Sequence, residues 1–382
     1  MPGWLAPRRS WLWLPVQLAS VAVLVGCGAE HAAQIDPGPE PPNAAVGGAA
    51  PAVMSGVAGK SPSRVETEPL PTPTPSVTPQ PLTFVEPFAR CQGSDVTLLA
   101  EGQSGGGMAL AVDEARVYYG TRHGVMSVPI EGGTPEPFAY AGLPVQIVVD
   151  ADAVYFSDQG IIRVDKASGQ VTLLADRSTL GVAVRGPDVY FSTWAALRTS
   201  IQHWSDGVLR TVVEFNSEEY VPRLIAQGDE LFYAPLASVG SGLPVTRYGL
   251  SDDSFQPLAK VDVARSFAVA EGYLYYTEES TRSVKRVATA GGEPSTLGEF
   301  AGYPVAIAAD ETHVFFTLHE LDQNSHQYSG RVIRMSVDGA SPCEIGSFDG
   351  YGAAMTLDDR YVYWQTSGSA ESATAVVARA LK

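Results

Sequence analysis

The sequence predicts an all-β fold, a seven-bladed β-propeller of four-stranded blades, and two observations support this prediction. First, a unit of about forty residues made of strand and turn signals recurs seven times. Each unit contains one aliphatic and two aromatic residues in a row, at Val117–Tyr119, Val154–Phe156, Val189–Phe191, Leu231–Tyr233, Leu274–Tyr276, Val314–Phe316 and Val362–Trp364. Second, the last unit ends at Lys382 before its fourth strand, whereas residues 95–100 match the fourth strand of an earlier unit, residues 170–175.

The strands of each unit follow one another in a constant order. A first strand of small aliphatic residues suits the crowded axis of a propeller, and we expect it at 109–112, 147–149, 182–184, 224–226, 267–269, 306–308 and 355–357. A short turn leads to the aromatic second strand. The third strand carries a recurring basic residue, at Arg163, His203, Arg247, Arg286, Arg334 and Arg379. A glycine-containing turn, whose glycine supplies a positive φ, then leads to the fourth strand.

The two ends of the repeat region are expected to meet. Pairing residues 95–100 on the outside of the last blade covers exposed strand edges and closes the ring. Cys343 begins the outer strand of the sixth blade, and Cys91 lies just before the closing strand on the neighbouring seventh blade. The sequence therefore predicts a disulfide between Cys91 and Cys343, with two free buried thiols as the alternative.

The N-terminus has the features of an exported precursor. Arg8 and Arg9 precede an apolar run that Pro15 interrupts, which is typical of a signal peptide over residues 1–26. Leu24–Cys27 resembles the lipobox of bacterial lipoproteins, although Val25 stands where alanine or serine is commoner. The resemblance implies that Cys27 carries acyl chains such as palmitate. An ordinary signal peptide with a chance cysteine is the alternative, and Arg8–Leu12 also partly matches a twin-arginine export signal, so the export route stays open.

Residues 27–83 are expected to form a disordered tether between the lipid-attached cysteine and a propeller domain over residues 84–382. Residues 28–83 contain no aromatic residue and are rich in proline, alanine, glycine and threonine. Such a segment cannot bury enough apolar surface to offset the entropy of ordering. Its proline and threonine content is also compatible with a glycosylated stalk.

The charge balance bears on partners and location. The chain has 42 acidic against 25 basic residues, a formal net charge of −17 at pH 7, and should repel nucleic acid and anionic lipid headgroups. Membrane attachment must then come from the acyl chains. Gly28 after the cysteine resembles the pattern that permits sorting to the outer membrane, so we expect a lipid-anchored, extracytoplasmic monomer of a bacterial envelope.

The repeat resembles those of the NHL and YWTD propeller families. The resemblance rests on Val182–Val184 before Val189–Phe191 and on Leu274–Glu278, and it covers residues 91–382. Those families usually have six blades where this chain has seven units, so none of their ligand residues is transferred. Together with the lipobox, the resemblance implies a lipoprotein whose propeller serves as a docking platform.

Three segments offer catalytic or metal-binding residue types. Gly102–Gly106 has the letters of a hydrolase nucleophile elbow, but an inner strand follows where that motif needs a helix. His319–His326 gathers metal-ligand types, but seven residues separate the histidines, and a solvated loop is the expectation. The positions entering the inner strands, which propeller enzymes use for metal carboxylates, are Met108, Gln146, Arg223, Arg265, Pro304 and Ala353. We therefore expect no cofactor.

Aromatic and arginine residues suggest where a ligand binds. The connections from outer to inner strands and those between second and third strands share one face of a propeller, including loops 234–244 and 318–330. We call this the loop face, and its candidate binding residues are Tyr140, Trp194, Arg198, Tyr220, Arg223, Arg265, Tyr303 and Tyr351. The sequence thus favours non-covalent binding of an envelope protein or glycan. A hydrolase or lyase with an unrecognised channel site and a purely structural envelope component are the alternatives.

Overall fold

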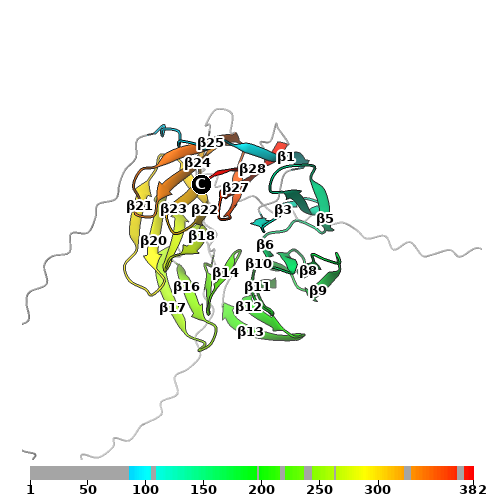
Figure 1. Cartoon of the computed structure of the whole chain (residues 1–382). Coiled ribbons are helices and arrows are strands. Elements are labelled where there is room, and N and C mark those ends of the chain that lie inside the picture. Colours follow the sequence, from blue (N-terminus) through cyan, green and yellow to red (C-terminus); the bar gives the residue numbers. More distant parts are fainter. Residues whose placement is uncertain are drawn as a thin grey trace, which may run out of the picture. The chain divides into compact units, whose positions relative to one another are not determined.

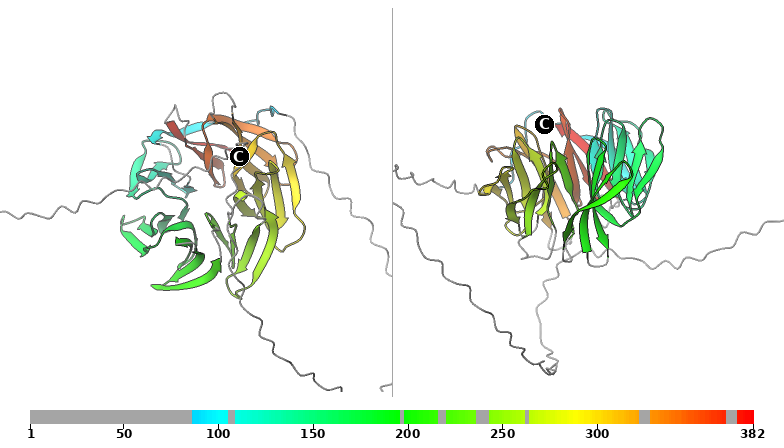
Figure 2. Two further views of the ribbon diagram at one scale, coloured as in Figure 1. Left: turned by 180° about the vertical axis from the view of Figure 1, so that it is seen from behind. Right: turned by 90° about the horizontal axis from the view of Figure 1, so that it is seen from below.

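The described part of the chain is a seven-bladed propeller, as the sequence predicts. The computed structural model describes residues 86–104, 109–195, 198–215, 220–235, 243–261, 264–321, 328–367 and 374–382. These residues form seven four-stranded antiparallel sheets arranged in a ring (Figures 1 and 2). Among them there is no helix with the length and apolar character of a membrane span.

The strands follow the chain from blade to blade. Blade 1 contains β2 (Leu110–Val112), β3 (Arg116–Thr121), β4 (Gly124–Pro129) and β5 (Glu136–Tyr140); blade 2 contains β6 (Ile147–Val149), β7 (Ala153–Ser157), β8 (Ile161–Asp165) and β9 (Val171–Ala175). Blade 3 contains β10 (Thr179–Arg185), β11 (Asp188–Ala195), β12 (Arg198–Ser205) and β13 (Val208–Phe215); blade 4 contains β14 (Leu224–Gln227), β15 (Glu230–Tyr233), β16 (Leu243–Gly249) and β17 (Phe255–Val261). Blade 5 contains β18 (Ala264–Ala270), β19 (Tyr273–Glu278), β20 (Ser283–Ala288) and β21 (Ser295–Glu299); blade 6 contains β22 (Tyr303–Ala309), β23 (His313–Leu321), β24 (Tyr328–Ser336) and β25 (Cys343–Asp349). Blade 7 contains β26 (Gly352–Leu357), β27 (Tyr361–Thr366), β28 (Thr374–Leu381) and, on its outside, β1 (Thr97–Ser104).

The hydrophobic core lies between neighbouring blades. Phe232 of blade 4, for example, belongs to one buried cluster with Phe267 and Tyr276 of blade 5. The small first strand and the aromatic second strand therefore have separate roles, since one lines the axis and the other fills the space between sheets. The recurring basic residue of the third strand lies directly opposite the middle residue of the aromatic triplet, as in the pairs Tyr155 with Arg163, Tyr275 with Arg286 and Tyr363 with Arg379.

Acidic turns join the first strand to the second. Asp358 Oδ1 accepts the backbone N–H groups of Arg360 and Tyr361, both at 2.7 Å, and its Oδ2 accepts the Tyr363 hydroxyl at 2.6 Å. The same capping of two backbone N–H groups occurs at Asp113, Asp150 and Asp310. The short aspartate side chain satisfies turn groups that the sheet leaves unpaired, which explains the aspartate in these four turns.

In blades 2, 3, 5, 6 and 7, a polar side chain at the end of the second strand ties the blade to the next one. Thr317 Oγ1 of blade 6 donates to Gly352 O of blade 7 at 3.3 Å and accepts Ala306 N of its own blade at 3.0 Å. Equivalent bonds to a backbone carbonyl of the following blade come from Ser157, Ser192, Thr277 and, as an amide, Gln365. These bonds hold each connection between blades against the hairpin of the preceding blade.

The closing strand is confirmed, with a different span from the one predicted. β1 pairs with β28 from Thr97 opposite Arg379 to Ser104 opposite Thr374, so the expected range 95–100 was shifted. The match to the short β9 set that range, whereas β28 is eight residues long and supplies partners further along, with two irregularities in the register. Val96 instead packs against Gly346 of β25, so closely that a Cβ atom at position 346 would lie only 2.8 Å from Val96 Cγ2.

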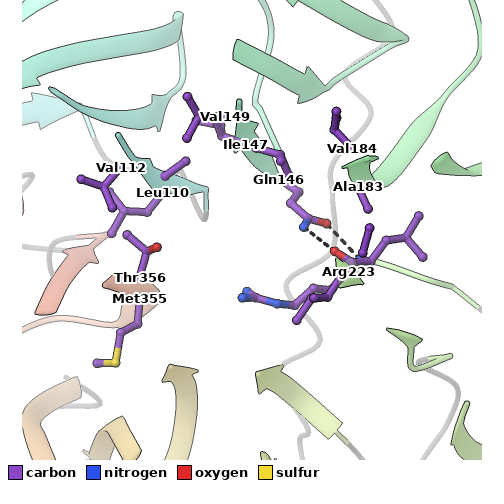
Figure 3. A pocket seen from close by; sticks show the side chains of 15 residues that line it. Leu110, Val112, Gln146, Ile147, Val149, Ala183, Val184, Arg223, Met355 and Thr356 are labelled. Atoms are coloured by element: carbon purple, nitrogen blue, oxygen red, sulfur yellow. Dashed lines mark hydrogen bonds between the residues drawn. The ribbon is translucent and has the colours of Figure 1, made fainter. Parts of the chain in front are cut away.

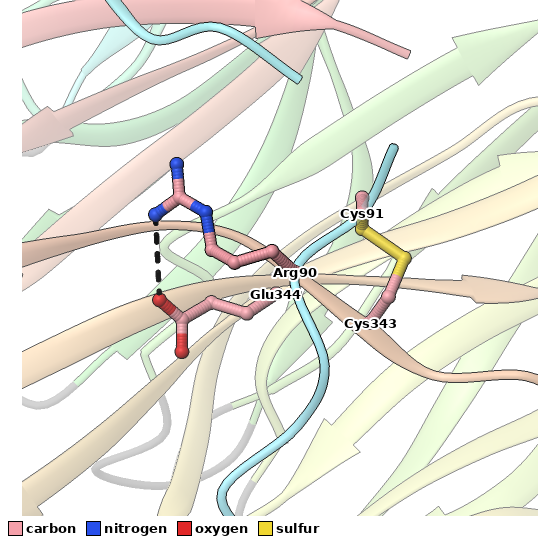
Figure 4. The surroundings of a disulfide bond; sticks show 4 residues. All are labelled: Arg90, Cys91, Cys343 and Glu344. Atoms are coloured by element: carbon pink, nitrogen blue, oxygen red, sulfur yellow. Dashed lines mark ion pairs between the residues drawn. A yellow bond between two sulfur atoms is a disulfide. The ribbon is translucent and has the colours of Figure 1, made fainter. Parts of the chain in front are cut away.

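The predicted disulfide is present and joins the segment before β1 to blade 6. Cys91 and Cys343 are bonded, with their Cα atoms 5.0 Å apart. Around the bond, Cys91 N donates to Glu344 O and Glu344 N donates to Ala89 O, both at 2.8 Å. Arg90 also lies beside Glu344 in an ion pair of 3.8 Å (Figure 4). The N-terminal segment therefore crosses the outside of blade 6 before it closes blade 7.

Candidate functional site

The loop face contains one pair of exposed aromatic rings in contact. Trp194 is the penultimate residue of β11, and Tyr220 lies in the connection from blade 3 to blade 4. Their ring centroids are 5.4 Å apart, and the residues are 41% and 38% exposed. Ser192, two residues before Trp194, donates from its hydroxyl to Val221 O and so holds the connection beside the hairpin. The sequence therefore predicted two residues that the fold brings together.

Arg198 and Tyr140 also lie on the surface. Arg198 starts β12 opposite Ala195, next to the Trp194 position, and its side chain is exposed. Tyr140 ends β5 and is 85% exposed, which is the largest exposure among the large hydrophobic residues described. Arg198 is close in the hairpin to the aromatic pair, whereas nothing in the register connects Tyr140 with it.

Tyr303 and Tyr351 are occupied by packing within the protein. Arg282, from the hairpin of blade 5, places its guanidinium 4.6 Å from the centre of the Tyr303 ring and donates to its hydroxyl at 3.1 Å. The Tyr351 ring centroid lies 4.6 Å from that of His319 and 5.5 Å from that of Tyr328. Sequence reasoning missed Arg282 and Tyr328, because both lie in or beside loops whose partners come from the next blade.

His319 is a core residue, which corrects the expectation that residues 319–326 form a solvated loop. β23 continues through His319 to Leu321, and the His319 side chain is fully buried. Its ring lies among Tyr351, Phe348 at 5.7 Å and Tyr328 at 6.5 Å, and its Nε2 is 3.2 Å from Thr317 Oγ1. His326 lies outside the described residues. The aromatic neighbours come from β24, from β25 and from the connection to blade 7, and the local spacing of histidines does not show them.

The burial of His319 predicts a pH-dependent loss of stability. Burial lowers the pKa of His319 from 6.5 to about 4, since the charged imidazolium loses its hydration. The unfolded chain therefore takes up this proton first as the pH falls below 6.5, and the folded state takes it up only near pH 4. We expect the free energy of unfolding to fall by about 3 kcal/mol more in the wild type than in His319→Gln between pH 7 and pH 4. Urea unfolding of both proteins at the two pH values measures this, and equal losses would contradict the prediction.

Arg223 and Gln146 face the axis of the propeller, where a cavity of about 250 Å³ opens between the inner strands. Both residues immediately precede an inner strand, β14 and β6 respectively. Figure 3 shows the Arg223 side chain extending across the cavity toward the wall that carries Met355 and Thr356. The sequence analysis named Arg223 both among the loop-face candidates and among the positions that enter the inner strands, and in the structure its side chain lines the channel. Arg265 lies in β18, and its side chain is outside the described part.

Gln146 closes one side of this cavity by joining three blades. Its Oε1 accepts Val182 N of blade 3 and Leu224 N of blade 4, both at 3.1 Å. Its Nε2 donates to Leu224 O at 2.9 Å (Figure 3). The inner strands present unpaired backbone groups to the axis, and this amide satisfies three of them at once.

The described residues form neither the nucleophile elbow nor the metal site that the sequence analysis considered. Gly102, Gln103 and Ser104 end the closing strand β1, and residues 105–108 lie outside the description. No group of three or more His, Cys, Asp or Glu residues in the described ranges is arranged to hold a metal ion. Among the described residues that line the cavity, Arg223 carries the only formal charge.

Comparisons with known proteins agree with the fold. No protein-family model and no curated protein matches the chain, so the NHL or YWTD repeat type stays a prediction. Among solved structures, the computationally designed Ika8 protein has a TM-score of 0.50 at 13% identity, covering 73% of this chain and 98% of that one. The extracellular domain of BT4673 from B. thetaiotaomicron has a TM-score of 0.50 at 11% identity, covering 75% of this chain and 40% of that one. A chain of a nidogen/laminin complex follows with a TM-score of 0.47 at 16% identity, covering 61% and 93%. At these identities the likeness shows the fold alone.

Proposed function

We propose that this protein is an extracytoplasmic binding or scaffold propeller whose loop face docks an envelope protein or glycan. The observation that carries the proposal is the contact between the exposed rings of Trp194 and Tyr220. Rings of this kind present a large, rigid contact area with polar atoms at the edge, and they dominate the energy of protein interfaces and stack well on sugar rings. Arg198 next to the pair adds hydrogen-bond donors at the same place.

The pair Trp194 and Tyr220 should behave as a binding hot spot. We expect Trp194→Ala and Tyr220→Ala each to weaken capture of the envelope ligand by at least about 30-fold, because truncation removes ring contact area at the centre of the site. Pull-down from solubilised envelope with the full chain, followed by titration of the captured component, measures the loss.

The matched control is Phe255→Ala, since Phe255 is an aromatic residue of outer strand β17 that is 51% exposed away from the loop face. Its capture should stay at the wild-type level. Wild-type capture by Trp194→Ala, or an equal loss in Phe255→Ala, would remove the loop face from the binding function.

The location follows from the N-terminal sequence and the disulfide. In this proposal, residues 1–26 are a signal peptide, Cys27 carries the acyl chains, and residues 27–83 tether the propeller to a bacterial membrane, with the outer membrane favoured. The bond between Cys91 and Cys343 supports export, since stable disulfides form mainly in oxidising compartments. A tether lets a membrane-bound module search for a partner without fixing its orientation.

Replacing Cys27 by serine tests the anchor. We expect the Cys27→Ser protein to leave the membrane fraction for the soluble fraction, because the thiol that accepts the diacylglycerol is lost. Fractionation of cells that express the full chain, with detection of incorporated labelled palmitate, measures the change. Continued membrane attachment of Cys27→Ser, without label, would point to a different anchor.

A further inference from the structure

The channel cavity holds a half-buried cation without a partner among the described residues. Arg223 makes no hydrogen bond and no ion pair with any described residue, and its Nε is completely buried without an acceptor. Burial lowers the pKa of Arg223 to about 10, so the guanidinium is still charged at neutral pH. A buried charge of this kind lowers stability unless an opposite charge or a hydrogen-bond acceptor accompanies it.

Arg331, the basic residue of a second cavity, is paired with carboxylates, unlike Arg223. That cavity, of about 360 Å³, lies on blade 6 and is lined by Arg331 together with Glu320. There the guanidinium is paired with the carboxylates of both Glu320 and Glu86. The fold therefore neutralises Arg331 with its own side chains, whereas the described residues around Arg223 offer it no carboxylate.

The walls of the channel cavity restrict what can enter it. Besides Arg223, Gln146 and Thr356, the side chains that line it are apolar, among them Leu110, Val112, Ile147, Val149, Val184 and Met355, while backbone groups of the inner strands add polar atoms (Figure 3). The oxygen and one N–H of the Gln146 amide are already hydrogen-bonded to backbone groups, so this amide does not balance the charge of Arg223. A volume of about 250 Å³ corresponds to roughly eight water molecules. One positive charge, apolar walls and this size suit a small monoanion that has an apolar part.

We propose that the propeller channel binds a small organic carboxylate, whose carboxylate group pairs with Arg223 and whose apolar part packs against the aliphatic inner strands. Arginine presents two parallel N–H groups that match the two oxygens of a carboxylate. The net charge of −17 does not prevent this binding, because physiological salt screens charges further away than about 8 Å. The site is independent of the loop-face hot spot, since it uses neither Trp194 nor Tyr220.

The test compares butyrate with its uncharged analogue butyramide on the purified full chain. Isothermal titration calorimetry should detect butyrate binding to the wild type with an affinity in the millimolar range or better, and butyramide should bind at least about 10-fold more weakly. Arg223→Met, which keeps the length and apolar stem of the side chain, should lose about 10- to 100-fold in butyrate affinity. Arg177→Met is the matched control, because Arg177 is an exposed arginine in the connection from β9 to β10 that does not line the cavity, and it should bind as the wild type does.

A second variant keeps the proposal testable if Arg223→Met does not fold. Val149→Phe leaves Arg223 in place and fills part of the cavity from a half-buried position on β6, so it should also abolish butyrate binding. Inorganic phosphate serves as a competing probe and should displace butyrate poorly, because it has no apolar part to pack against the aliphatic side chains of the inner strands. Equal affinity for butyrate and butyramide, unchanged binding in Val149→Phe, or an equal loss in Arg177→Met would each overturn the proposal.

Discussion

Replacing both Cys91 and Cys343 by serine should lower the free energy of unfolding by about 5 kcal/mol, at the upper end of what one disulfide contributes. The bond closes a loop with a sequence separation of 252 residues, which is nearly the whole propeller. In the unfolded chain such a cross-link removes the entropy of a very long loop, and this entropy grows slowly with length. The bond also fixes the segment that must reach blade 7 before β1 can pair.

Urea unfolding of the wild type, of the double serine variant and of reduced wild type measures this contribution. The reduced wild type is the matched control, since it has the same loop freedom as the variant but keeps both sulfur atoms. The non-covalent contacts of the segment, such as Cys91 N to Glu344 O, should survive in the folded state of all three. If the variant and the oxidised wild type unfold at the same urea concentration, the disulfide does not stabilise the ring.

The sequence was sufficient to predict the architecture because each blade repeats the same pattern of strands and turns. The aromatic triplets define the second strand, and the strand spacing then places the basic residue of the third strand opposite them, as Tyr155 and Arg163 show. The count of strands also predicted the closing strand, since the last unit has only three strands of its own and its outer position is left to be filled. Its exact span was not predictable, because β28 and the irregularities in its pairing with β1 set it.

The candidate site was predicted only in part, because side chains reach across blades. Trp194 and Tyr220 were both among the loop-face candidates, and the fold brings their rings into contact, since the end of β11 lies beside the connection from blade 3 to blade 4. Local spacing placed Gln146 and Arg223 at the entrances of inner strands but could not show that Gln146 bonds to Leu224 two blades away, because that bond depends on how the blades are arranged around the axis. The burial of His319 was missed for the same reason, since Tyr351 and Phe348 cover it from other strands.

Leu99→Asp should cost about 4–5 kcal/mol of stability, while Leu98→Asp in the same strand should cost about 0.5 kcal/mol or less. Leu99 is 4% exposed and belongs to the core cluster that contains Tyr119 of blade 1 and Tyr363 of blade 7. An aspartate there places an unpaired charge between the first and last blades, at the seam that closes the ring. Leu98 points away and is 50% exposed, so its aspartate stays in water.

Comparing Leu99→Asp with Leu98→Asp separates the effect of ring closure on stability from the effect of strand propensity. Both variants put the same poor strand former into β1, next to one another, so a loss that came from propensity alone would be equal in the two. Urea unfolding measures the difference in free energy, and hydrogen exchange of the β28 amides that face β1 locates it. Selective exchange at Val377 and Arg379 in Leu99→Asp would show that the ring opens at blade 7, because these amides alternate along β28 with that of Val376, which donates to Thr366 of β27. Equal stability of Leu98→Asp and Leu99→Asp would mean that β1 is an attachment to an already closed ring, and that the first and last blades hold together through Gln365 and Gly120 without it.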